Sequence, residues 1–350
     1  MNMNESSMLP DAALEQFLRS CGLLSHGEQA RCEPLSGGVS SDIWRVDIGG
    51  RVLCVKRALA QLKVEAEWKA PLSRNAYEWA WMKFAAQHCP DNLPQPLAHD
   101  REAGFFAMSY LEPREHPVWK QQLMRGDVEP AIARSVGEVL GRLHAASAGR
   151  ADIAAAFPTI DNFYALRLEP YLVATAARHP DLAPVLHEMV ARTAGTQHAL
   201  VHGDVSPKNI LVGPRGPVFL DAECAWYGDP AFDLAFCLNH LLLKRLVQPQ
   251  ALAPLGASFE ALAAGYFEHV AWEARDRLEE RAARLLPALL LARVDGKSPL
   301  EYVTQDAQRA LVRAVAVPLL RKPVGRLHHV ERAWRRVLGD GPLPSHELPL

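Results

Sequence analysis

One stretch of the sequence, residues 199–223, constrains the fold more than any other. A short apolar run leads into the turn His202-Gly203-Asp204, and Asn209 follows five residues after Asp204, at the start of the next apolar run. One further apolar segment, residues 217–220, then leads to Asp221. Short apolar runs bounded by turn residues are typical of strands. We therefore expect Asp204, Asn209 and Asp221 to gather at the rim of one small sheet.

These polar groups suit a divalent cation and a proton acceptor. Mg²⁺ prefers oxygen ligands from carboxylates, amides and phosphates, so we predict that Asn209 and Asp221 bind Mg²⁺. Glu223 follows two residues later and is either a second metal contact or a hydrogen-bond anchor. Asp204 then remains to accept a proton from a substrate hydroxyl or to orient it. His202 precedes the turn that exposes Asp204, so we expect it to organise the loop rather than act as the base.

The pattern H-G-D-x-x-x-x-N, followed by an apolar hairpin and D-x-E, resembles the catalytic core of the aminoglycoside phosphotransferase and choline kinase superfamily. The corresponding loop of protein kinases reads H-R-D-x-x-x-x-N, with D-F-G later. The resemblance implies an α+β, protein-kinase-like two-lobed fold. It also implies ATP or GTP and Mg²⁺ as cofactors. The implied acceptor is a small-molecule hydroxyl, on a sugar, a thiosugar, an amino-alcohol or an aminoglycoside-like compound.

Residues 34–57 alternate with a period of two, and the runs 43–47 and 51–57 flank Gly49-Gly50. This pattern predicts a β-hairpin with Cys54 and Lys56 on one face of its second strand. The resemblance implies that Lys56 reaches the α- and β-phosphates and that Cys54 lies over the adenine. The alternative for Lys56 is a solvated charge on a strand.

Residues 75–87 have the apolar spacing of a helix. Lys56 should need a carboxylate partner on the helix that follows the hairpin. Glu65, Glu67 and Glu78 are candidates, and we favour Glu78 because it begins the well-formed amphipathic segment.

The expected phosphate-covering loop departs from the family pattern G-x-G-x-x-G. It contains Gly37, Gly38 and Ser40, whose backbone and hydroxyl groups suit phosphate oxygens, although an ordinary hairpin turn is the alternative. The apolar sequence of residues 104–111 predicts a further strand. The resemblance implies that this strand runs into the hinge between the two lobes. There the resemblance implies that the adenine edge bonds the backbone carbonyl of Ser109 and the backbone N–H of Leu111.

Beyond Pro113 the sequence becomes helical and rich in alanine, so we predict a β-rich N-lobe over residues 1–112 and a mainly helical C-lobe over residues 113–350. Asp233 lies at the start of an apolar helix. It is either a first-turn carboxylate of this helix or, as the resemblance implies, a hydrogen-bond partner of the catalytic loop. Lys208 either contacts the transferred phosphate or is a solvated loop charge.

Another apolar helix, around residues 289–297, ends in Arg293, Asp295 and Lys297 about Gly296. These residues form either a capped helix end or a polar pocket for a zwitterionic or anionic substrate.

Composition limits the possible partners. The 350 residues carry a net charge of −2, no apolar run reaches the roughly 20 residues that span a bilayer, and the start lacks a secretory pattern. We expect a cytoplasmic protein without nucleic-acid or membrane partners and leave its oligomeric state open. Residues 305–340 contain eight Lys or Arg against three Asp or Glu. Such a surplus, if it borders the pocket, would repel a polycationic aminoglycoside and favours a metabolite acceptor.

Two other functions fit parts of the sequence. The first is a catalytically silent nucleotide-binding or scaffold protein of the same fold. Retention of Lys56, Asp204, Asn209 and Asp221 argues against it. The second is a thiol hydrolase that uses Cys224 or Cys54, which lacks a convincing Cys–His arrangement.

Overall fold

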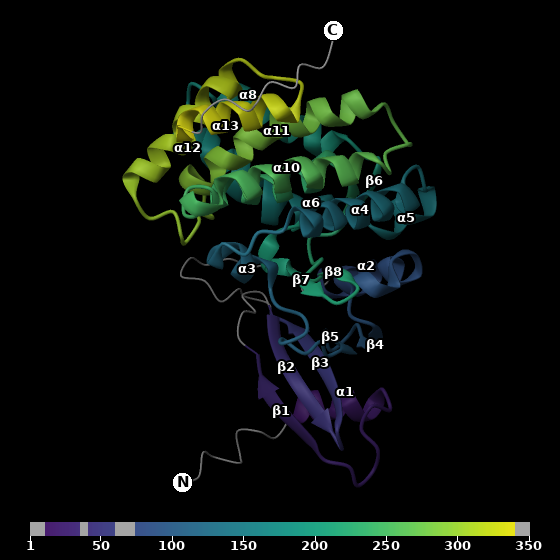
Figure 1. The fold of residues 1–350 in the computed structure, drawn as a ribbon. Helices are drawn as coiled ribbons and strands as arrows, with labels where there is room; N and C mark the ends of the chain where they lie inside the picture. Colours follow the sequence, from purple (N-terminus) through teal and green to yellow (C-terminus); the bar gives the residue numbers. More distant parts are fainter. Residues whose placement is uncertain (1–10, 36–40, 60–73, 340–350) are drawn as a thin grey trace. The chain divides into compact units, whose positions relative to one another are not determined.

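The computed structural model describes residues 11–35, 41–59 and 74–339 (Figure 1). The chain divides into two compact units. The first unit comprises residues 1–117 and 211–225, and the second comprises residues 118–210 and 226–350. Within the described ranges, no helix combines the length and the apolar character needed to cross a membrane.

The first unit contains an antiparallel five-stranded sheet in the order β1-β2-β3-β5-β4. The strands are β1 (Ala30–Pro34), β2 (Ser41–Ile48), β3 (Arg51–Ala58), β4 (Pro96–Asp100) and β5 (Phe105–Ser109). The predicted hairpin is confirmed, because β2 pairs with β3 across a turn in which Gly49 and Gly50 have φ angles of 60° and 90°. Such positive φ angles cost glycine little, which explains the dipeptide.

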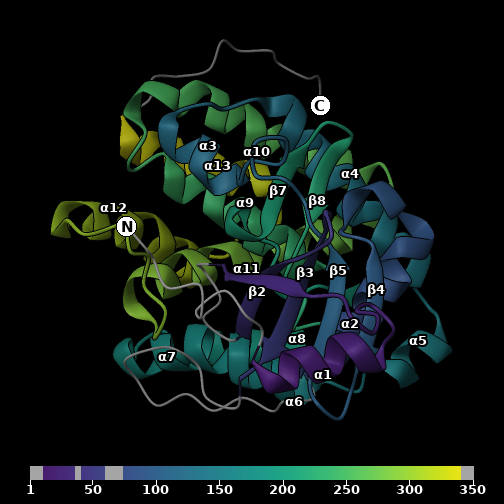
Figure 2. The same cartoon turned by 90° about the horizontal axis from the view of Figure 1, so that it is seen from below.

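Two helices cover opposite faces of this sheet. Helix α1 (Ala12–Ser20) buries Leu14, Phe17 and Leu18 against a core that includes Leu53 and Val55 of β3 (Figure 2). Helix α2 (Arg74–His88) packs on the other face, where the ring of Trp79 stacks on His99 at 5.2 Å and lies 6.1 Å from Phe106. Side chains alternate along a strand. Cys54 and Lys56 therefore face the side of α2, as the period of two predicts.

The chain segment 211–225 also belongs to the first unit. It contains most of β7 (Ile210–Gly213) and all of β8 (Gly216–Phe219), which pair as a two-stranded sheet. The side-chain amide of Asn92, at the end of the 3₁₀ turn η2 (Pro90–Asn92), donates to the carbonyl of Pro217 at 2.8 Å.

The prediction of one small sheet around the H-G-D turn is wrong. Strand β6 (Ala199–Val201) pairs instead with β9 (Trp226–Gly228), and the hairpin β7–β8 is a separate sheet. Every residue of β6 is buried, so its backbone needs a partner strand, and β9 provides it in the register Leu200↔Tyr227. The sequence does not mark β9, because it is three residues long and has no alternating pattern.

The second unit is otherwise helical. Helix α9 (Ala231–Lys244) lies at its centre with every residue buried, which explains why its sequence is mostly apolar. The other elements are α3 (Trp119–Arg125), α4 (Pro130–Ser147), α5 (Ala151–Ala156), α6 (Ile160–Phe163), the π-helical segment η3 (Tyr164–Val173), α7 (Ala174–Arg178), α8 (Ala183–Gly195), η4 (Pro207–Asn209), η5 (Pro249–Ala251), α10 (Leu252–Phe267), α11 (Arg275–Asp295), α12 (Asp306–Arg321) and α13 (Leu327–Leu338). Helices α4 and α10 pack closely. Gly137 permits this approach, because a Cβ atom at this position would lie 2.1 Å from the carbonyl oxygen of Leu262.

Candidate active site

A buried cation and the two carboxylates that it contacts form the polar centre of the first unit. Lys56 on β3 is 4% exposed, and its Nζ lies 2.8 Å from Glu78 Oε2 on α2. The same Nζ lies 2.5 Å from Oδ1 of Asp221, beyond β8. The structure thus brings together Lys56 and the carboxylate that the sequence favoured as its partner. Lys56 is not the solvated strand charge of the alternative interpretation.

Burial and neighbouring charges oppose each other at this centre. Burial alone lowers the pKa of Lys56, but Asp221, Glu78 and Glu223 raise it above its usual value, so the ammonium group stays charged. Burial raises the pKa of Glu78 to about 7, although Lys56 acts in the opposite direction. The site therefore holds a permanently charged cation whose partner Asp221 is 27% exposed.

Asp221 has an unusual backbone conformation. Its φ angle is 67°, and no other non-glycine residue of the described ranges has a positive φ. Asp tolerates this region better than most residues, yet the conformation costs free energy and is enriched at functional sites. Two residues further, Glu223 Oε2 accepts a hydrogen bond of 2.9 Å from Nε of the buried Arg74. This ion pair favours the interpretation of Glu223 as an anchor.

The turn at residues 202–204 is fixed by a carboxylate of the second unit. Asp233, in the first turn of α9, accepts the backbone N–H groups of His202 at 2.7 Å and Gly203 at 2.8 Å. His144 Nε2 lies 3.2 Å from the same carboxylate. Asp233 is thus both a first-turn carboxylate of α9 and the hydrogen-bond partner of this loop. His202 Nδ1 accepts the backbone N–H of Asp204 at 3.2 Å, consistent with a loop-organising residue.

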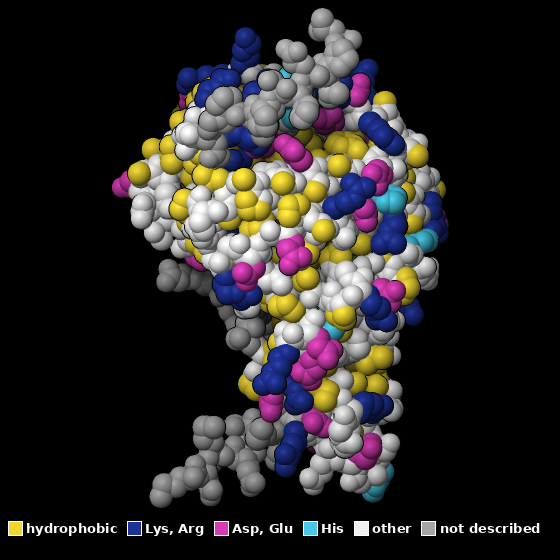
Figure 3. Space-filling view, viewed as in Figure 1, with side chains coloured by type: hydrophobic (Ala, Val, Ile, Leu, Met, Phe, Trp, Pro, Cys, Tyr) yellow, Lys and Arg dark blue, Asp and Glu magenta, His cyan; other side chains and the backbone are white. Residues whose placement is uncertain are grey.

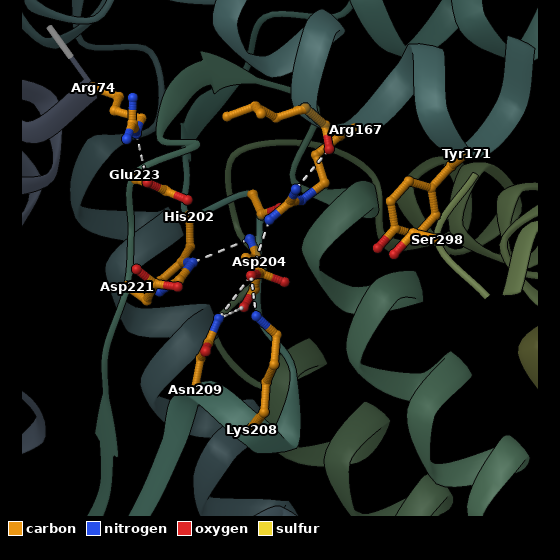
Figure 4. Close-up of polar contacts among 12 residues, drawn as sticks. Arg74, Arg167, Tyr171, His202, Asp204, Lys208, Asn209, Asp221, Glu223 and Ser298 are labelled. Atoms are coloured by element: carbon orange, nitrogen blue, oxygen red, sulfur yellow. Dashed lines mark hydrogen bonds and ion pairs between the residues drawn. The ribbon is translucent and has the colours of Figure 1, made fainter. Parts of the chain in front are cut away.

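Asp204 is 4% exposed, and three nitrogen atoms of neighbouring side chains contact its Oδ2 atom (Figure 4). Its Oδ2 accepts from Asn209 Nδ2 at 2.8 Å and lies 3.1 Å from Lys208 Nζ and 2.9 Å from Arg167 Nη2. The bond from Asn209 fixes which way its amide points. Within the described residues, nothing donates to Oδ1 of Asn209, so this oxygen is oriented and available as a ligand.

Arg167 is a site residue that the sequence does not reveal. It lies on η3, which contains Pro170, and its Nε also donates to the carbonyl of Gly203 at 2.6 Å. Its guanidinium carbon lies 5.9 Å from the ring centroid of Phe236 on α9. No local pattern connects Arg167 to the H-G-D turn. Its place on a π-helical segment, a type that is rare and enriched at functional sites, is visible only in the structure.

The other predicted nucleotide contacts are partly described. Cys54 is buried opposite Met108, and Ser109 ends β5 with its N–H donated to Gln95 at 2.9 Å. Among the described residues, no protein group accepts the backbone N–H of Leu111. Gly37, Gly38 and Ser40 lie outside the described residues.

The thiol groups do not support a hydrolase. Burial raises the pKa of Cys54 to about 12, so its thiol is protonated and a poor nucleophile at neutral pH. Cys224 is completely buried. Neither thiol is therefore placed to attack a substrate.

The structure does not join the three residues at the end of α11 in one group. Arg293 Nη1 contacts the hydroxyls of Tyr171 and Ser298, at 2.9 and 3.1 Å. Asp295 binds Arg313 through both oxygens and accepts His179 Nε2 at 2.8 Å, and Lys297 pairs with Glu169. Gly296 caps the helix, but its φ is −87°. It is needed because a Cβ would lie 2.5 Å from the carbonyl of Ala292, not because of a left-handed conformation.

The basic surplus of residues 305–340 is matched in part by acids from elsewhere in the second unit, since Asp295, Asp181 and Asp276 lie outside this stretch and Asp306 and Glu331 lie within it. Five of its arginines form ion pairs: Arg309–Asp306, Arg313–Asp295, Arg321–Asp181, Arg326–Asp276 and Arg335–Glu331. On the face shown in Figure 3, charges of both signs are interspersed among apolar and neutral atoms. The surplus is therefore a weaker argument against a cationic acceptor than the sequence count indicates.

Two comparisons of the sequence agree with the resemblance stated above. A sequence model of a phosphotransferase enzyme family matches residues 31–279. The chain is similar to the methylthioribose kinase of Pectobacterium atrosepticum, with 26% identity over 71% of this chain and 68% of that protein. It is 27% identical to the methylthioribose kinase of Pectobacterium carotovorum subsp. carotovorum over 58% of this chain. That match spans 57% of the relative, so the chain covers little more than half its length.

Solved structures show the same fold. An amicoumacin kinase, solved with AMP-PNP and Ca²⁺, aligns over 94% of this chain and all of its own, with 15% identity and a TM-score of 0.56. The macrolide 2′-phosphotransferase of Brachybacterium faecium aligns over 95% of this chain and all of its own, with 20% identity and a TM-score of 0.50. The predicted α+β, protein-kinase-like fold is confirmed.

Proposed function

Because the chain belongs to the phosphotransferase enzyme family, we propose that it transfers the γ-phosphoryl group of ATP to a small-molecule hydroxyl, with Asp204 as the catalytic residue. The family makes the chain a small-molecule kinase. The observation that carries the assignment of Asp204 is its environment. It is a buried carboxylate whose Oδ2 lies within 3.1 Å of Asn209, Lys208 and Arg167.

Lys56 is the proposed ligand of the α- and β-phosphates. Its burial and its contact with Glu78 support this role, because a fixed and permanently charged ammonium group suits phosphate oxygens. Cys54 lies on the same face of β3, where we propose that it packs on the adenine. The backbone carbonyl of Ser109 and the N–H of Leu111 are the proposed contacts of the adenine edge. We also propose that Gly37, Gly38 and Ser40 cover the phosphates.

The described residues offer suitable ligands for Mg²⁺, although in those ranges no three His, Cys, Asp or Glu side chains form a metal-binding group. Asn209 presents an oriented amide oxygen, and Asp221 presents a partly exposed carboxylate. Both are oxygen donors, which Mg²⁺ prefers together with phosphate oxygens and water. When bound, Mg²⁺ neutralises charge on the nucleotide phosphates. Glu223 is proposed as a further ligand only if it leaves Arg74.

The chemical step requires positioning more than covalent chemistry. Asp204 orients the acceptor hydroxyl and receives its proton, while Arg167 and Lys208 balance the carboxylate charge. Asn209 donates from its NH₂ group to the carboxylate of Asp204. One amide therefore contacts the proposed base through its nitrogen and is the proposed metal ligand through its oxygen. Asp233 keeps the turn in place through two backbone hydrogen bonds.

Substitution of Asp204 tests this assignment. We expect Asp204→Ala to lower kcat by at least about two orders of magnitude, the range of a positioned acid–base group, and to leave ATP affinity nearly unchanged. ADP formation under Mg²⁺-ATP measures kcat, and AMP-PNP titration measures binding. Asp181→Ala, which removes a carboxylate from an exposed ion pair, is the matched control. Loss of nucleotide binding with unchanged turnover of the bound fraction would contradict the proposed role.

The acceptor is proposed only as a class. Methylthioribose is the first neutral compound to test, because it is named in the matched sequence relatives. A silent scaffold protein would show no Mg²⁺-dependent ADP formation with any acceptor.

A further inference from the structure

The second unit buries two cations near each other at the ends of α9 and α11. Lys244, the last residue of α9, is 1% exposed, and Arg293, in the last turn of α11, is 8% exposed. Lys244 Nζ lies 3.7 Å from the ring centroid of Tyr302. Arg293 Nη1 donates to the hydroxyls of Tyr171 and Ser298, the latter two visible in Figure 4. We call Lys244, Arg293, Tyr171, Ser298 and Tyr302 the cationic cluster.

The described residues supply no carboxylate within ion-pair distance of either cation. Glu301 acts on Lys244 electrostatically, but its carboxylate contacts Lys120. Nε of Arg293 and the hydroxyl of Tyr302 are buried and have no hydrogen-bond partner in the described ranges. Buried charges are normally paired and buried donors normally bonded. The cluster thus has donors and positive charge that the chain itself does not satisfy.

Apart from Glu301, the charged groups that act on Lys244 are cations. Burial lowers the pKa of His240 well below its usual value, so this imidazole is neutral. Burial, Lys120 and Arg293 lower the pKa of Lys244 to about 7, against the opposite effect of Glu301. The cation–π contact with Tyr302 compensates part of the ammonium charge. An anion would compensate it further and would also accept the free donors.

Aromatic contacts connect the cluster to the proposed catalytic carboxylate. Arg167, which contacts Asp204 at 2.9 Å, lies over the ring of Phe236. The ring of Phe236 is 5.6 Å from that of Tyr171, which bonds Arg293. All these residues belong to the second unit, so this series of contacts from the cluster to Asp204 runs within one compact unit.

We propose that the cationic cluster binds an anionic group of the phosphoryl acceptor, a carboxylate or a phosphate, and thereby presents the hydroxyl of that acceptor to Asp204. This inference rests on the proposed function and narrows the acceptor from any hydroxyl compound to a hydroxy acid or a phosphate ester. It assigns Lys244, which no sequence pattern indicates, as a specificity-determining residue. It also gives Arg293 a role that Asp295 and Lys297 do not share.

Small anions test the site without knowledge of the acceptor. The full chain, saturated with AMP-PNP and Mg²⁺, is unfolded thermally at constant ionic strength with acetate, inorganic phosphate or neutral acetamide. A ligand that binds only the folded state raises Tm. We expect acetate or phosphate to raise Tm and acetamide to leave it unchanged. The effective anion distinguishes a carboxylate acceptor from a phosphate ester.

Variants locate the effect. We expect Lys244→Met and Arg293→Gln each to abolish the anion-dependent rise in Tm, while Arg321→Gln, which removes an exposed cation paired with Asp181, retains it. If one of the two cluster variants does not fold, the anion-dependent change in Tm of the other variant tests the proposal. Equal anion effects in wild type and the folded cluster variants would overturn the proposal. So would a wild-type chain that neither anion stabilises more than acetamide does.

An activity measurement separates this inference from the proposed function. D-gluconate and its neutral counterpart sorbitol, and glucose 6-phosphate and glucose, are compared as acceptors by Mg²⁺-ATP-dependent ADP formation. We expect the anionic member of a pair to be preferred at least about tenfold in kcat/KM. ADP formation with equal use of neutral acceptors would overturn the inference alone. Anion binding to the cluster without ADP formation for any acceptor would count against the proposed function alone.

Discussion

At the scale of single residues, Lys244 connects burial to a measurable pH dependence. Its pKa is about 7 in the folded chain against an ordinary value of 10.5. Between these pH values the unfolded chain binds more protons than the folded chain, so the free energy of unfolding rises with pH. As pH falls toward 7, the free energy of unfolding decreases by the same amount. One group contributes a slope of at most about 1.4 kcal/mol per pH unit.

We therefore expect Lys244→Met to flatten the rise in unfolding free energy between pH 7 and 10. Methionine has a similar shape and no titrating group, so the difference between the two proteins isolates Lys244. Denaturant unfolding in chloride buffer at several pH values measures it. Identical slopes for wild type and variant would show that Lys244 keeps an ordinary pKa in the folded chain.

Single residues also show which parts of the site the sequence reveals. The pair Lys56–Glu78 was predictable, because the hairpin fixes the face of Lys56 and the amphipathic helix favours Glu78. Asp204 and Asn209 were predictable from their fixed spacing in one turn. Arg167 and Lys244 were not, because each meets its partners through packing of segments far apart in the sequence.

At the scale of elements, the close packing of α4 on α10 depends on glycine. A Cβ at residue 137 would lie 2.1 Å from the carbonyl oxygen of Leu262 and 2.9 Å from the backbone nitrogen of Tyr266. Backbone atoms cannot move aside as a flexible side chain can. We expect Gly137→Ala to lower the free energy of unfolding by about 1–3 kcal/mol or more, the cost of overpacking.

Gly195→Ala is the matched control, because its Cβ would have no neighbour within 4 Å and Gly195 lies in α8. Alanine is the better helix former, so this variant should be unchanged or slightly more stable. Urea unfolding measures both variants. A Gly137→Ala chain as stable as wild type would mean that α4 and α10 are further apart than the structure has them.

The elements that the sequence predicted share a strong local signal. The hairpin β2–β3 has alternation and a Gly-Gly turn, and residues 75–87 in α2 have apolar residues at helical spacing. Strands β1 and β4 were not predicted, because β1 is a short edge strand with polar residues and β4 begins at Pro96 and contains an irregularity. The pairing of β6 with β9 was missed because pairing partners depend on long-range contacts, which no local pattern encodes.

At the scale of the whole molecule, the two units carry different parts of the proposed reaction. The first unit holds Lys56, Glu78 and Asp221, and the second holds Asp204 and Asn209. The family resemblance, rather than composition, predicted that these groups serve one phosphoryl transfer. Composition alone supports no more than an ordinary globular chain with a small net charge.

Metal-dependent nucleotide binding shows whether this chain holds a nucleotide together with Mg²⁺. AMP-PNP is titrated calorimetrically into the full chain with and without Mg²⁺, and the titration is repeated with Asp221→Asn. Asparagine tolerates the positive φ of this position and so preserves the backbone. We expect Mg²⁺ to tighten nucleotide binding at least about tenfold in wild type and to have little effect in Asp221→Asn. Equal nucleotide affinity with and without Mg²⁺ in wild type, or a full Mg²⁺ effect in the variant, would contradict this expectation.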